Sequence, residues 1–365
     1  MRILVAGGGT GGHLYPGLAI ARALVKADAE VEPFFVGAQR GIEKEVLPKA
    51  EFPFVLLDLH PLYRSQVWKS WRTIVGGMKA WRAIARLASE DRPRAVVGTG
   101  GYASVIALAY GAAKGIPVVL QEQNSFPGIA TRVFSRFARQ IHLGFPEARM
   151  YLKPRVGGLV YGTGNPIQPP PETRPSRADA RAAWGFPADA RVLLAFGGSQ
   201  GAVAVNEVVA AWLRRGIPDD VHVIWATGRG SFETYATIES DRVRVRDYIA
   251  PMESAYAAAD IALARAGAMS TAELAAWGVP MILVPLPTAA ADHQTTNARA
   301  LEAAGAATVI TQRDFSTERL DAEVRAIFDT AGRIEQMSAS VLDRARPKAA
   351  AEIAAHILEL VKQAS

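Results

Sequence analysis

Short apolar runs alternate with helix-like stretches along the whole chain, and this alternation constrains the fold more than any other feature of the sequence. Apolar runs of this length and spacing are typical of parallel βαβ units in which helices cover both faces of a sheet. The runs form two series, at residues 3–6, 31–36, 54–59, 95–97 and 117–120, and at residues 192–196, 222–226, 243–246, 261–264, 281–284 and 307–310. The sequence therefore predicts an α/β protein with two doubly wound parallel sheets.

A segment rich in Pro and Gly separates the two series. Residues 162–171 read Gly-Thr-Gly-Asn-Pro-Ile-Gln-Pro-Pro-Pro, and this composition excludes regular structure and forms a semi-rigid joint. A chain of 365 residues is long enough for about two domains. We therefore predict an N-terminal domain over residues 1–163 and a C-terminal domain over residues 164–347. An amphipathic stretch over residues 348–365 is expected to form a last helix that packs back on the first domain.

Composition narrows the class of protein. Half of the residues are hydrophobic and 21% are charged, which suits a globular protein with a large core. The chain has no Cys, which excludes disulfides, thiolate metal sites and cysteine nucleophiles. The apolar run after Met1 and Arg2 is too short for a signal peptide, so we expect a cytoplasmic protein. Glycines interrupt the uncharged run over residues 95–113, which favours a strand, a loop and a helix over a membrane span.

Three glycine-rich loops follow predicted strands directly. Glycines let the backbone turn tightly and let a ligand approach the N–H groups at the start of the next helix. Each loop is therefore a candidate site for an anion or a sugar hydroxyl, although a tight βα turn requires glycine even without a ligand. The loops are Gly7-Gly-Gly-Thr-Gly-Gly-His13, Gly98-Thr-Gly-Gly101 and Gly197-Gly-Ser-Gln-Gly201.

The first loop also fits the G-x-G-x-x-G pattern of dinucleotide-binding proteins, so an NAD-dependent dehydrogenase is an alternative. Such a protein carries an acidic residue at the end of its second strand to bind the ribose. Here that strand runs into Gly37, Ala38 and Gln39, and the nearby acids Glu30 and Glu32 precede the strand or lie at its start. The sequence therefore disfavours a dinucleotide cofactor.

Two further strand ends carry polar residues in the second half of the chain. Glu273 could accept hydrogen bonds from both hydroxyls of a ribose, although Ser270 and Glu273 also match the S-x-x-E capping box. Spacing alone favours the cap. The loop after residues 281–284 carries Gln294 and Asn297, which are uncharged hydrogen-bonding residues of the kind that bind sugars, and which equally suit helix capping.

Seven motifs in register along the chain resemble the MurG family of bacterial glycosyltransferases. The resemblance covers essentially the whole chain, and its implied fold is GT-B, with two Rossmann-like domains facing a deep cleft. The motifs are Gly8-Gly-Thr-Gly-Gly-His13, Gly98-Thr-Gly-Gly-Tyr102, Glu122-Gln-Asn124, Gly164-Asn-Pro166, Gly197-Gly-Ser-Gln-Gly-Ala202, Arg265-Ala-Gly-Ala268 with Glu273, and Asp292-His-Gln294 with Asn297-Ala298.

The resemblance implies an inverting transferase that moves N-acetylglucosamine (GlcNAc) from UDP-GlcNAc to undecaprenyl-linked lipid I, giving lipid II for peptidoglycan. The alternative within the same fold is another enzyme that uses UDP-GlcNAc, either a transferase with a different acceptor or a 2-epimerase. The donor would lie mainly on the second domain and the acceptor on the first. Uracil and ribose would contact the Ile249 backbone and the loop Ala268, Met269, Ser270, Thr271, Ala272 and Glu273. Ser199 would contact the diphosphate, and Gln294 the sugar. On the first domain, Thr10, Gly11, Gly12 and Asn124 would close over the sugar.

Two positions depart from the family's motifs. An arginine of the family that would contact the donor nucleotide is replaced by Gln168, so either another cation such as Arg265 substitutes or donor affinity is lower. A histidine that precedes the family's Glu-Gln-Asn motif is replaced by Gln121. Neither change removes Asn124.

Sugar transfer with inversion requires a base for the acceptor hydroxyl and positive potential for the departing UDP. His13 is the first candidate for the base, because its ordinary pKa near 6.5 suits proton transfer at neutral pH. Glu122 and Asp292 are the alternatives, and a His13 that only binds substrate or caps its helix is the competing interpretation. No D-x-D triplet occurs in the chain, so we expect helix dipoles at the diphosphate and neither a metal nor a tightly bound cofactor.

Basic and aromatic residues gather over residues 60–89, which hold six basic residues and no acidic one. Tryptophans flanked by cations suit the boundary of lipid headgroups. We therefore expect a peripheral protein at the cytoplasmic face of the inner membrane, with an amphipathic core helix as the alternative. Because the cations are confined to one segment and no nucleic-acid motif occurs, a nucleic-acid partner is not expected. The predicted contacts with the anionic surface are Trp68, Lys69, Trp71, Arg72, Met78, Lys79, Trp81 and Arg82.

Overall fold

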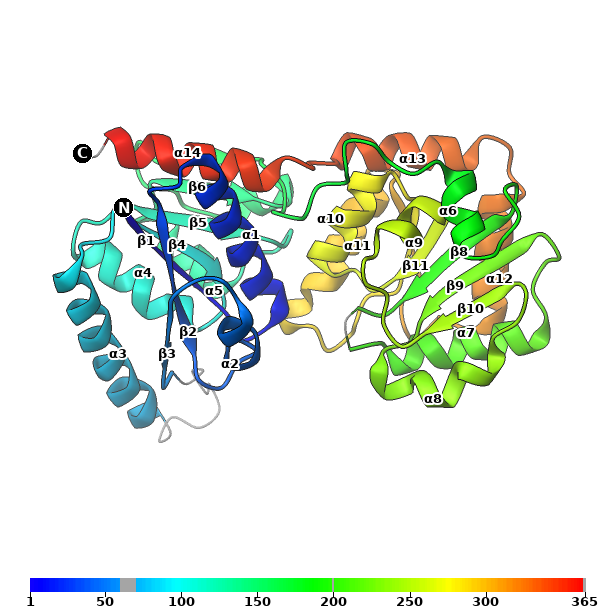
Figure 1. The fold of residues 1–365 in the computed structure, drawn as a ribbon, viewed down its shortest axis with the longest axis horizontal. Coiled ribbons are helices and arrows are strands. Elements are labelled where there is room, and N and C mark those ends of the chain that lie inside the picture. Colours follow the sequence, from blue (N-terminus) through cyan, green and yellow to red (C-terminus); the bar gives the residue numbers. More distant parts are fainter. Residues whose placement is uncertain (60–69, 199, 364–365) are drawn as a thin grey trace. The chain divides into compact units, whose positions relative to one another are not determined.

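The computed structural model describes residues 1–59, 70–198 and 200–363, with side chains between 70 and 74 excepted. The described chain divides into two compact units, one from Met1 to Gln168 together with the residues from Lys348 onward, and one from Pro169 to Pro347. Each unit is a parallel sheet with helices (Figure 1). The predicted α/β class with two doubly wound parallel sheets is confirmed.

The N-terminal unit is built on a sheet with the strand order β3-β2-β1-β4-β5-β6-β7, and all of its pairings are parallel. Its strands are β1 (Arg2–Gly7), β2 (Glu32–Ala38), β3 (Phe54–Leu57), β4 (Ala95–Gly100), β5 (Val118–Glu122), β6 (Gln140–Leu143) and β7 (Leu159–Tyr161). Its helices are α1 (Gly11–Ala27), α2 (Glu43–Val46), α3 (Ser70–Glu90), α4 (Ser104–Ala113), α5 (Ile129–Phe134) and α14 (Ala349–Gln363), with short 3₁₀ turns η1 (Leu47–Lys49) and η3 (Pro146–Tyr151).

The C-terminal unit has the strand order β10-β9-β8-β11-β12-β13, again with parallel pairing throughout the named strands. Its strands are β8 (Arg191–Phe196), β9 (Val221–Ala226), β10 (Val243–Arg246), β11 (Ile261–Ala264), β12 (Met281–Leu283) and β13 (Ala307–Val309). Its helices are α6 (Arg177–Ala183), α7 (Val203–Arg215), α8 (Phe232–Tyr235), α9 (Glu253–Ala258), α10 (Ala268–Trp277), α11 (His293–Ala303), α12 (Thr317–Phe328) and α13 (Arg333–Arg344), with 3₁₀ turns η4 (Arg229–Ser231), η5 (Ala236–Ile238) and η6 (Ala290–Asp292).

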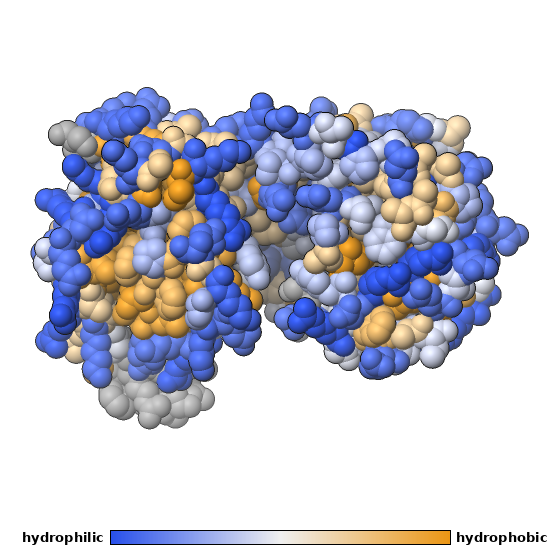
Figure 2. Space-filling model, viewed as in Figure 1, coloured by the Kyte–Doolittle hydropathy of each residue, from blue (hydrophilic) through white to orange (hydrophobic). Residues whose placement is uncertain are grey.

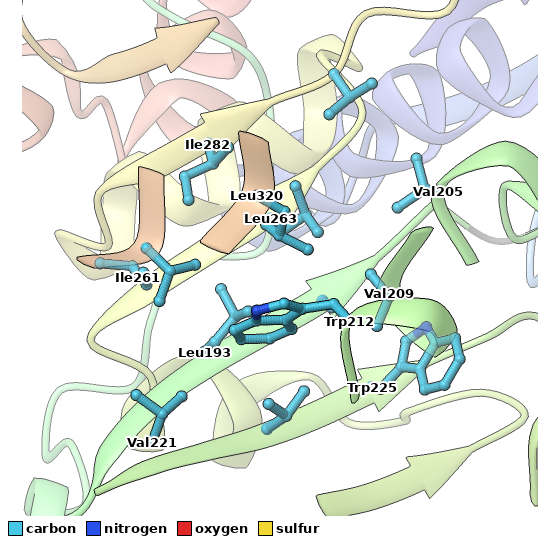
Figure 3. Packing of buried hydrophobic residues seen from close by; sticks show 14 of the residues in the cluster. Leu193, Val205, Val209, Trp212, Val221, Trp225, Ile261, Leu263, Ile282 and Leu320 are labelled. Atoms are coloured by element: carbon cyan, nitrogen blue, oxygen red, sulfur yellow. The ribbon is translucent and has the colours of Figure 1, made fainter. Parts of the chain in front are cut away.

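Large apolar side chains fill the space between this second sheet and its helices (Figure 3). Trp212 of α7 and Trp225 of β9 are both almost fully buried, and they lie among the branched residues of β8 and β11. The Trp212 indole N–H donates to Asp321 of α12, at 2.9 Å, and that of Trp225 donates to Asn206 of α7, at 3.1 Å. Each tryptophan therefore adds buried apolar area without leaving its polar atom unpaired.

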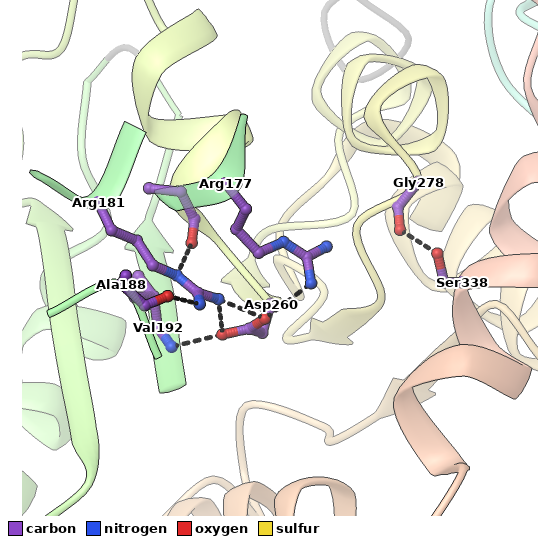
Figure 4. A network of polar contacts seen from close by, with 8 residues as sticks. Arg177, Arg181, Ala188, Val192, Asp260, Gly278 and Ser338 are labelled. Carbon is purple, nitrogen blue, oxygen red and sulfur yellow. Dashed lines mark hydrogen bonds and ion pairs between the residues drawn. The ribbon is translucent and has the colours of Figure 1, made fainter. Parts of the chain in front are cut away.

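A buried ion pair holds α6 against this sheet (Figure 4). The Arg181 guanidinium donates to both carboxylate oxygens of Asp260 at 2.7 Å, and Asp260 also accepts the Val192 backbone N–H at 2.7 Å. Arg177 donates to the same carboxylate at 3.1 Å. Both buried charges are thus paired and hydrogen-bonded, and the pair fixes the position of α6 beside β8.

The last helix, α14, packs beside α1 in the N-terminal unit (Figure 1). Its apolar face, which includes Ile353 and Ile357, is buried with residues of β1 and β4. Helix α14 also contacts β6, where the Gln140 side-chain amide donates to the His356 carbonyl oxygen at 2.9 Å. The rings of His142, Tyr161 and His356 stack beside this bond, with centroids 4.1 to 5.6 Å apart.

Two strands differ from the sequence-based expectation. Strands β6 and β7 were not predicted, because β6 alternates apolar residues with Gln140 and His142 and so lacks a continuous apolar run. The polar residues of β6 are buried because they meet α14 and β7, which are distant along the chain.

Candidate active site

The first glycine-rich loop lies where the strand order of the N-terminal sheet reverses. Strands β1 and β4 are neighbours there, and open α/β sheets bind ligands at such a switch point. Thr10 is the N-cap of α1 and is exposed, as is Gly12, while Gly11 is partly exposed. These three predicted sugar contacts are therefore accessible at the carboxyl end of the strands.

A buried glutamate binds the backbone of this loop, and the sequence did not predict it as a site residue. Glu43 of α2 is fully buried, and its carboxylate accepts the backbone N–H of Gly9 at 3.0 Å and that of Ala38 at 3.1 Å. A Cβ atom added at Gly8 would lie 1.8 Å from the same carboxylate. The loop glycines are thus required by the protein's own packing, and the N–H of Gly9 is already used.

His13 lies on the first turn of α1 and is partly exposed. Its Nδ1 atom is 3.0 Å from the amide oxygen of Gln123, a residue that sequence reasoning did not single out. The glycine-rich loop after β4 packs against the same ring, because Cβ atoms added at Gly100 or Gly101 would lie 2.8 or 3.1 Å from His13 atoms. The glycines of this loop therefore leave the space that the His13 ring occupies.

The two neighbours Glu122 and Asn124 form a loop of their own at the end of β5. The Glu122 carboxylate is 3% exposed and accepts the backbone N–H groups of Asn124, at 3.1 Å, and Gly128, at 3.0 Å. This carboxylate orders the loop, so it is a poor candidate for the base compared with His13. Asn124 is partly exposed.

In the C-terminal unit, three predicted ligand segments follow β8, β11 and β12, which are adjacent in the sheet. Their carboxyl ends meet at one edge, where ligands of such sheets bind. After β8, the predicted diphosphate residue Ser199 lies outside the described residues. Gly198 has φ +88° and no described atom within 4 Å of an added Cβ, and α7 then begins at Val203 without a side-chain cap.

The segment after β11 corrects one interpretation. Helix α10 begins at Ala268 with Gly267 as its N-cap, so Ser270 lies inside the helix and the capping box is wrong. The residues from Ala268 to Ala272, which include Met269, Ser270 and Thr271, form the first turns of α10. Thr271 donates back to the Gly267 carbonyl oxygen at 3.0 Å.

The Glu273 carboxylate accepts from a side chain, whereas in a capping box it would accept from a backbone N–H group. The Tyr256 hydroxyl of α9 donates to this carboxylate at 2.7 Å. Burial raises the pKa of Glu273, and this hydrogen bond partly offsets the rise. Burial and the nearby carboxylate raise the pKa of Tyr256, so the phenol remains a donor. One oxygen of Glu273 is thereby oriented, which suits a carboxylate that accepts from a ribose.

Arg265 does not replace the missing family arginine at the surface. The guanidinium is buried and donates to the carbonyl oxygen of Val284 at 3.0 Å and to the Gln312 side chain at 2.7 Å. Burial lowers the pKa of Arg265, because a charged guanidinium is less stable away from water. The hydrogen bonds of this buried charge order the loop after β12. Gln168 is exposed. Ile249 is buried, so only its backbone could meet a nucleobase, as predicted for it.

The segment after β12 holds the remaining candidate residues, and they differ in exposure and in their hydrogen-bond partners. The Gln294 side-chain oxygen accepts the Leu286 backbone N–H at 3.0 Å, which orients its amide nitrogen as the group able to donate to a sugar. Asn297 is fully buried and donates to the Ala266 carbonyl oxygen at 3.2 Å, so it shapes the loop before α10. Asp292 is exposed and accepts from Thr295 at 2.6 Å.

The basic aromatic window is only partly described. Trp68 and Lys69 lie outside the described residues, and Trp71 and Arg72 belong to α3 without described side chains. Met78, Lys79 and Arg82 are exposed. Trp81 instead packs edge-on against Tyr110, with ring centroids 5.1 Å apart, beside the core of the N-terminal unit. The core-helix alternative therefore accounts for Trp81.

No described helix is long and apolar enough to cross a membrane. Within the same residues, no three His, Cys, Asp or Glu side chains gather in a way that could hold a metal ion.

Comparisons with known proteins agree over both units. Residues 3–143 match the glycosyltransferase family 28 N-terminal domain, and residues 192–356 match the C-terminal domain of the same family. Two relatives are named UDP-N-acetylglucosamine–N-acetylmuramyl-(pentapeptide) pyrophosphoryl-undecaprenol N-acetylglucosamine transferase. The one from Salinibacter ruber is 39% identical over 98% of this chain and 96% of its own, and the one from Chlorobaculum parvum is 39% identical over 99% and 100%.

Solved structures show the same likeness. MurG from Acinetobacter baumannii superposes with a TM-score of 0.77 at 27% identity, covering 98% of this chain and 99% of that one. A UDP-N-acetylglucosamine 2-epimerase from Listeria monocytogenes shares only the fold, with a TM-score of 0.64 at 14% identity over 98% and 94%. The GT-B fold is confirmed, and the dehydrogenase alternative is set aside. The chain belongs to glycosyltransferase family 28 and, within it, to the MurG family.

Proposed function

We propose that this protein transfers GlcNAc from UDP-GlcNAc to the C4 hydroxyl of the N-acetylmuramic acid of lipid I, with inversion, giving lipid II for peptidoglycan synthesis. The observation that carries the proposal is the full-length similarity to transferases named for this reaction. Most of the accessible motif residues that are described lie at the carboxyl ends of parallel strands, the edge at which such sheets bind ligands.

In the proposed reaction His13 accepts the proton of the acceptor hydroxyl. The hydroxyl oxygen then attacks the anomeric carbon of GlcNAc, and the bond from that carbon to the diphosphate oxygen breaks, so the electron pair leaves with UDP. The first turn of α7, whose N-cap Ala202 supplies no side-chain hydrogen bond, offers backbone N–H groups to the diphosphate. Glu273 would accept from the ribose hydroxyls, and Gln294 would donate to the sugar.

The decisive experiment is transfer of labelled GlcNAc to a short-chain lipid I analogue by the purified protein, with and without acceptor. We expect a product that depends on the acceptor and persists in a parallel reaction with EDTA. An epimerase of the same fold would instead convert UDP-GlcNAc without acceptor, and that result would contradict the proposed function. Loss of transfer in EDTA would overturn only the metal-independent part.

We further propose that the protein attaches peripherally to an anionic membrane, through an exposed face of the N-terminal unit. Figure 2 shows hydrophobic residues gathered on the visible face of this unit among hydrophilic ones. Around α5, the apolar residues Ile129, Val133 and Phe137 recur every four positions and are each about half exposed, at 52%, 49% and 51%. Residues 129–159 hold six basic residues and one acidic one, Glu147.

This α5 face continues onto the 3₁₀ turn η3. The Lys153 backbone N–H donates to the Ser135 hydroxyl at 3.2 Å, and the Tyr151 ring packs edge-on against Phe126 at 4.9 Å. Met150 is 77% exposed beside them. An apolar surface with excess positive charge complements anionic lipid headgroups, and each cation near such a surface contributes about 1 kcal/mol.

Two matched variants distinguish the α5 face from α3. Phe137 and Met78 have the same exposed fraction, 51%. Phe137→Ser should reduce co-sedimentation with vesicles that contain phosphatidylglycerol more than Met78→Ser does, while both variants keep activity on a soluble acceptor. Release by Met78→Ser alone would place the contact on α3, and binding that is equal on neutral vesicles would contradict the electrostatic argument.

A further inference from the structure

The orientation of the Gln123 side chain can be assigned from its surroundings. Gln123 is 2% exposed, and its amide nitrogen lies 2.8 Å from the Thr99 carbonyl oxygen and 3.2 Å from that of Gln121. The Gln121 side-chain oxygen contacts the same nitrogen. All three neighbours are oxygens that accept hydrogen bonds in this arrangement. Because an amide NH₂ group donates and an amide oxygen only accepts, the nitrogen must face this group.

The amide oxygen of Gln123 then faces His13. It lies 3.0 Å from Nδ1, and since this oxygen has no hydrogen to give, Nδ1 must carry one. A neutral imidazole has a single ring hydrogen, so Nε2 keeps its lone pair. From this geometry we infer that Gln123 fixes His13 in the Nδ1–H tautomer and makes Nε2 the basic nitrogen.

The partners of Gln123 hold it in place from several directions. The Asn165 amide donates to the Gln123 carbonyl oxygen at 3.0 Å, and the Gln121 amide donates to the Asn165 side-chain oxygen at 3.2 Å. The Thr99 hydroxyl donates to the His13 carbonyl oxygen at 2.7 Å, which ties both ends of the pair to β4. Asn165 and Gln121 are buried as well. Rotating the Gln123 amide would set its oxygen against acceptors and its NH₂ group against the ring.

The same hydrogen bond serves both protonation states of His13. When Nε2 takes a proton, Nδ1 keeps its hydrogen and still donates to Gln123, so only the outward nitrogen changes during a catalytic cycle. This inference rests on the proposed function, in which Nε2 receives the proton of the acceptor hydroxyl. Gln123 is thus a positioning residue: it sets which ring nitrogen reacts and does not itself meet the substrate.

The partner of Nδ1 is also neutral, which separates this arrangement from a histidine paired with a carboxylate. An amide oxygen orients the ring but supplies no full negative charge to stabilise an imidazolium. The replacement of the family's histidine by Gln121 fits this network, because its side chain accepts from Gln123 through oxygen and donates to Asn165 through nitrogen.

Nitrogen NMR of protein labelled with ¹⁵N only in its histidine rings tests the tautomer directly. The chain has six histidines, and the spectrum of His13→Gln assigns the His13 signals by their loss. When its ring is neutral, wild-type His13 should show a protonated Nδ1 and an unprotonated Nε2. A hydrogen on Nε2 in the neutral ring would overturn the inference, and this measurement needs no variant of Gln123.

Gln123→Met then tests the consequence. This variant keeps the length of the side chain but removes its hydrogen bonds, so the Nε2–H tautomer should appear and kcat should fall by about tenfold, with little change in KM for UDP-GlcNAc. Gln121→Met is the matched control, since it disturbs the same network without touching the ring, and should leave the tautomer unchanged. An unchanged tautomer in Gln123→Met would contradict the assignment.

The two proposals fail in different ways. If the wild-type protein shows the Nδ1–H tautomer but transfers no GlcNAc, the inference about Gln123 stands and the proposed function falls. If it transfers GlcNAc while neutral His13 carries its hydrogen on Nε2, the proposed function stands and the inference is wrong.

Discussion

The glycine-rich loops after β1 and after β8 have similar sequences but differ in what surrounds them. At the loop after β1, a buried carboxylate accepts the Gly9 N–H, and the neighbouring loop after β4 leaves so little space that a Cβ at Gly101 would lie 2.1 Å from the Gly8 carbonyl oxygen. At the loop after β8, no described atom lies within 4 Å of a Cβ added at Gly198. In the loop after β1 the protein fills the space beside Gly8 and Gly9, whereas the loop after β8 is open at Gly198 but crowded at Gly201, where a Cβ would lie 2.2 Å from the Thr227 carbonyl oxygen.

The comparison teaches that a glycine-rich βα loop has two separate physical causes. In the first, glycine allows side chains such as Glu43 and His13 to pack close to backbone. In the second, positive φ at Gly198 shapes the turn while its surface stays open, as a site that receives a ligand requires. Substitutions at a crowded glycine and at an open glycine should therefore differ in their cost to stability.

The largest effect should come from adding one methyl group to the loop after β4, which packs against the loop after β1. Gly101→Ala combines a positive φ of +74° with the contact against the Gly8 carbonyl oxygen, so we expect a loss of about 3 kcal/mol or more in the free energy of unfolding. Gly198→Ala, with φ +88° and open surroundings, should lose about 1 kcal/mol. Urea denaturation of both variants measures the difference. Equal losses would remove the distinction between the loops.

The next prediction tests whether the Glu43 carboxylate stabilises the loop after β1. In Glu43→Gln one oxygen is replaced by an NH₂ group that cannot accept the N–H of Gly9 or Ala38, and losing a hydrogen bond to a buried carboxylate costs about 1.5–3 kcal/mol. Glu45→Gln on the same helix is the control, because Glu45 is exposed. Denaturant unfolding of both should show a loss only in the first. A stability of Glu43→Gln equal to that of the control would contradict the role of the carboxylate.

The affinity for UDP tests the predicted ligand site of the C-terminal unit. Glu273→Gln should weaken UDP binding by about tenfold, because an amide is a weaker acceptor than a carboxylate for the ribose hydroxyls. Unfolding should change little, since the amide oxygen can still accept from Tyr256. Calorimetric titration with UDP, alongside Tyr256→Phe, checks both statements. If Glu273→Gln lowers stability but leaves UDP affinity unchanged, Glu273 is structural.

Sequence predicted the elements better than it predicted the partners. The apolar runs located most strands, because a strand buried on both faces of a parallel sheet has a continuous apolar signature. Strand β6 lacks that signature because Gln140 and His142 face segments far along the chain. Ser270 and Glu273 show the same limit: their spacing matches a cap, yet the helix begins at Ala268.

The candidate site was predicted residue by residue but not as a network. Motifs named His13 and Asn124, whereas Gln123, Glu43 and Tyr256 act through contacts that span 110, 34 and 17 residues. No local periodicity encodes such contacts. Glu43 is followed by Lys44 and Glu45, and Gln123 stands between polar neighbours, so neither residue differs from its local sequence in a way that predicts burial.

The smallest effect concerns a neutral buried residue of the N-terminal unit. Burial, with His356 nearby, lowers the pKa of His142 to about 3, below the value near 6.5 expected in the unfolded chain. Between these values the unfolded chain binds more protons, so the stability contributed by His142 is complete above pH 6.5 and declines as the pH falls toward 3. The groups around His142 are Thr163, Tyr161 and His356, with Glu359 acting on Tyr161.

We expect the unfolding free energy to fall by about 1 kcal/mol between pH 6.5 and 5.5 through His142 alone. His142→Gln removes this titration, so the difference between the wild-type and variant curves of unfolding free energy against pH should show that slope. His222→Gln in the C-terminal unit is the matched comparison, because burial lowers its pKa in the same direction and it is less buried than His142. A wild-type slope that survives in His142→Gln would show that the ring stack tolerates a charged His142. The attachment of α14 would then rest on apolar packing and on the hydrogen bond from Gln140.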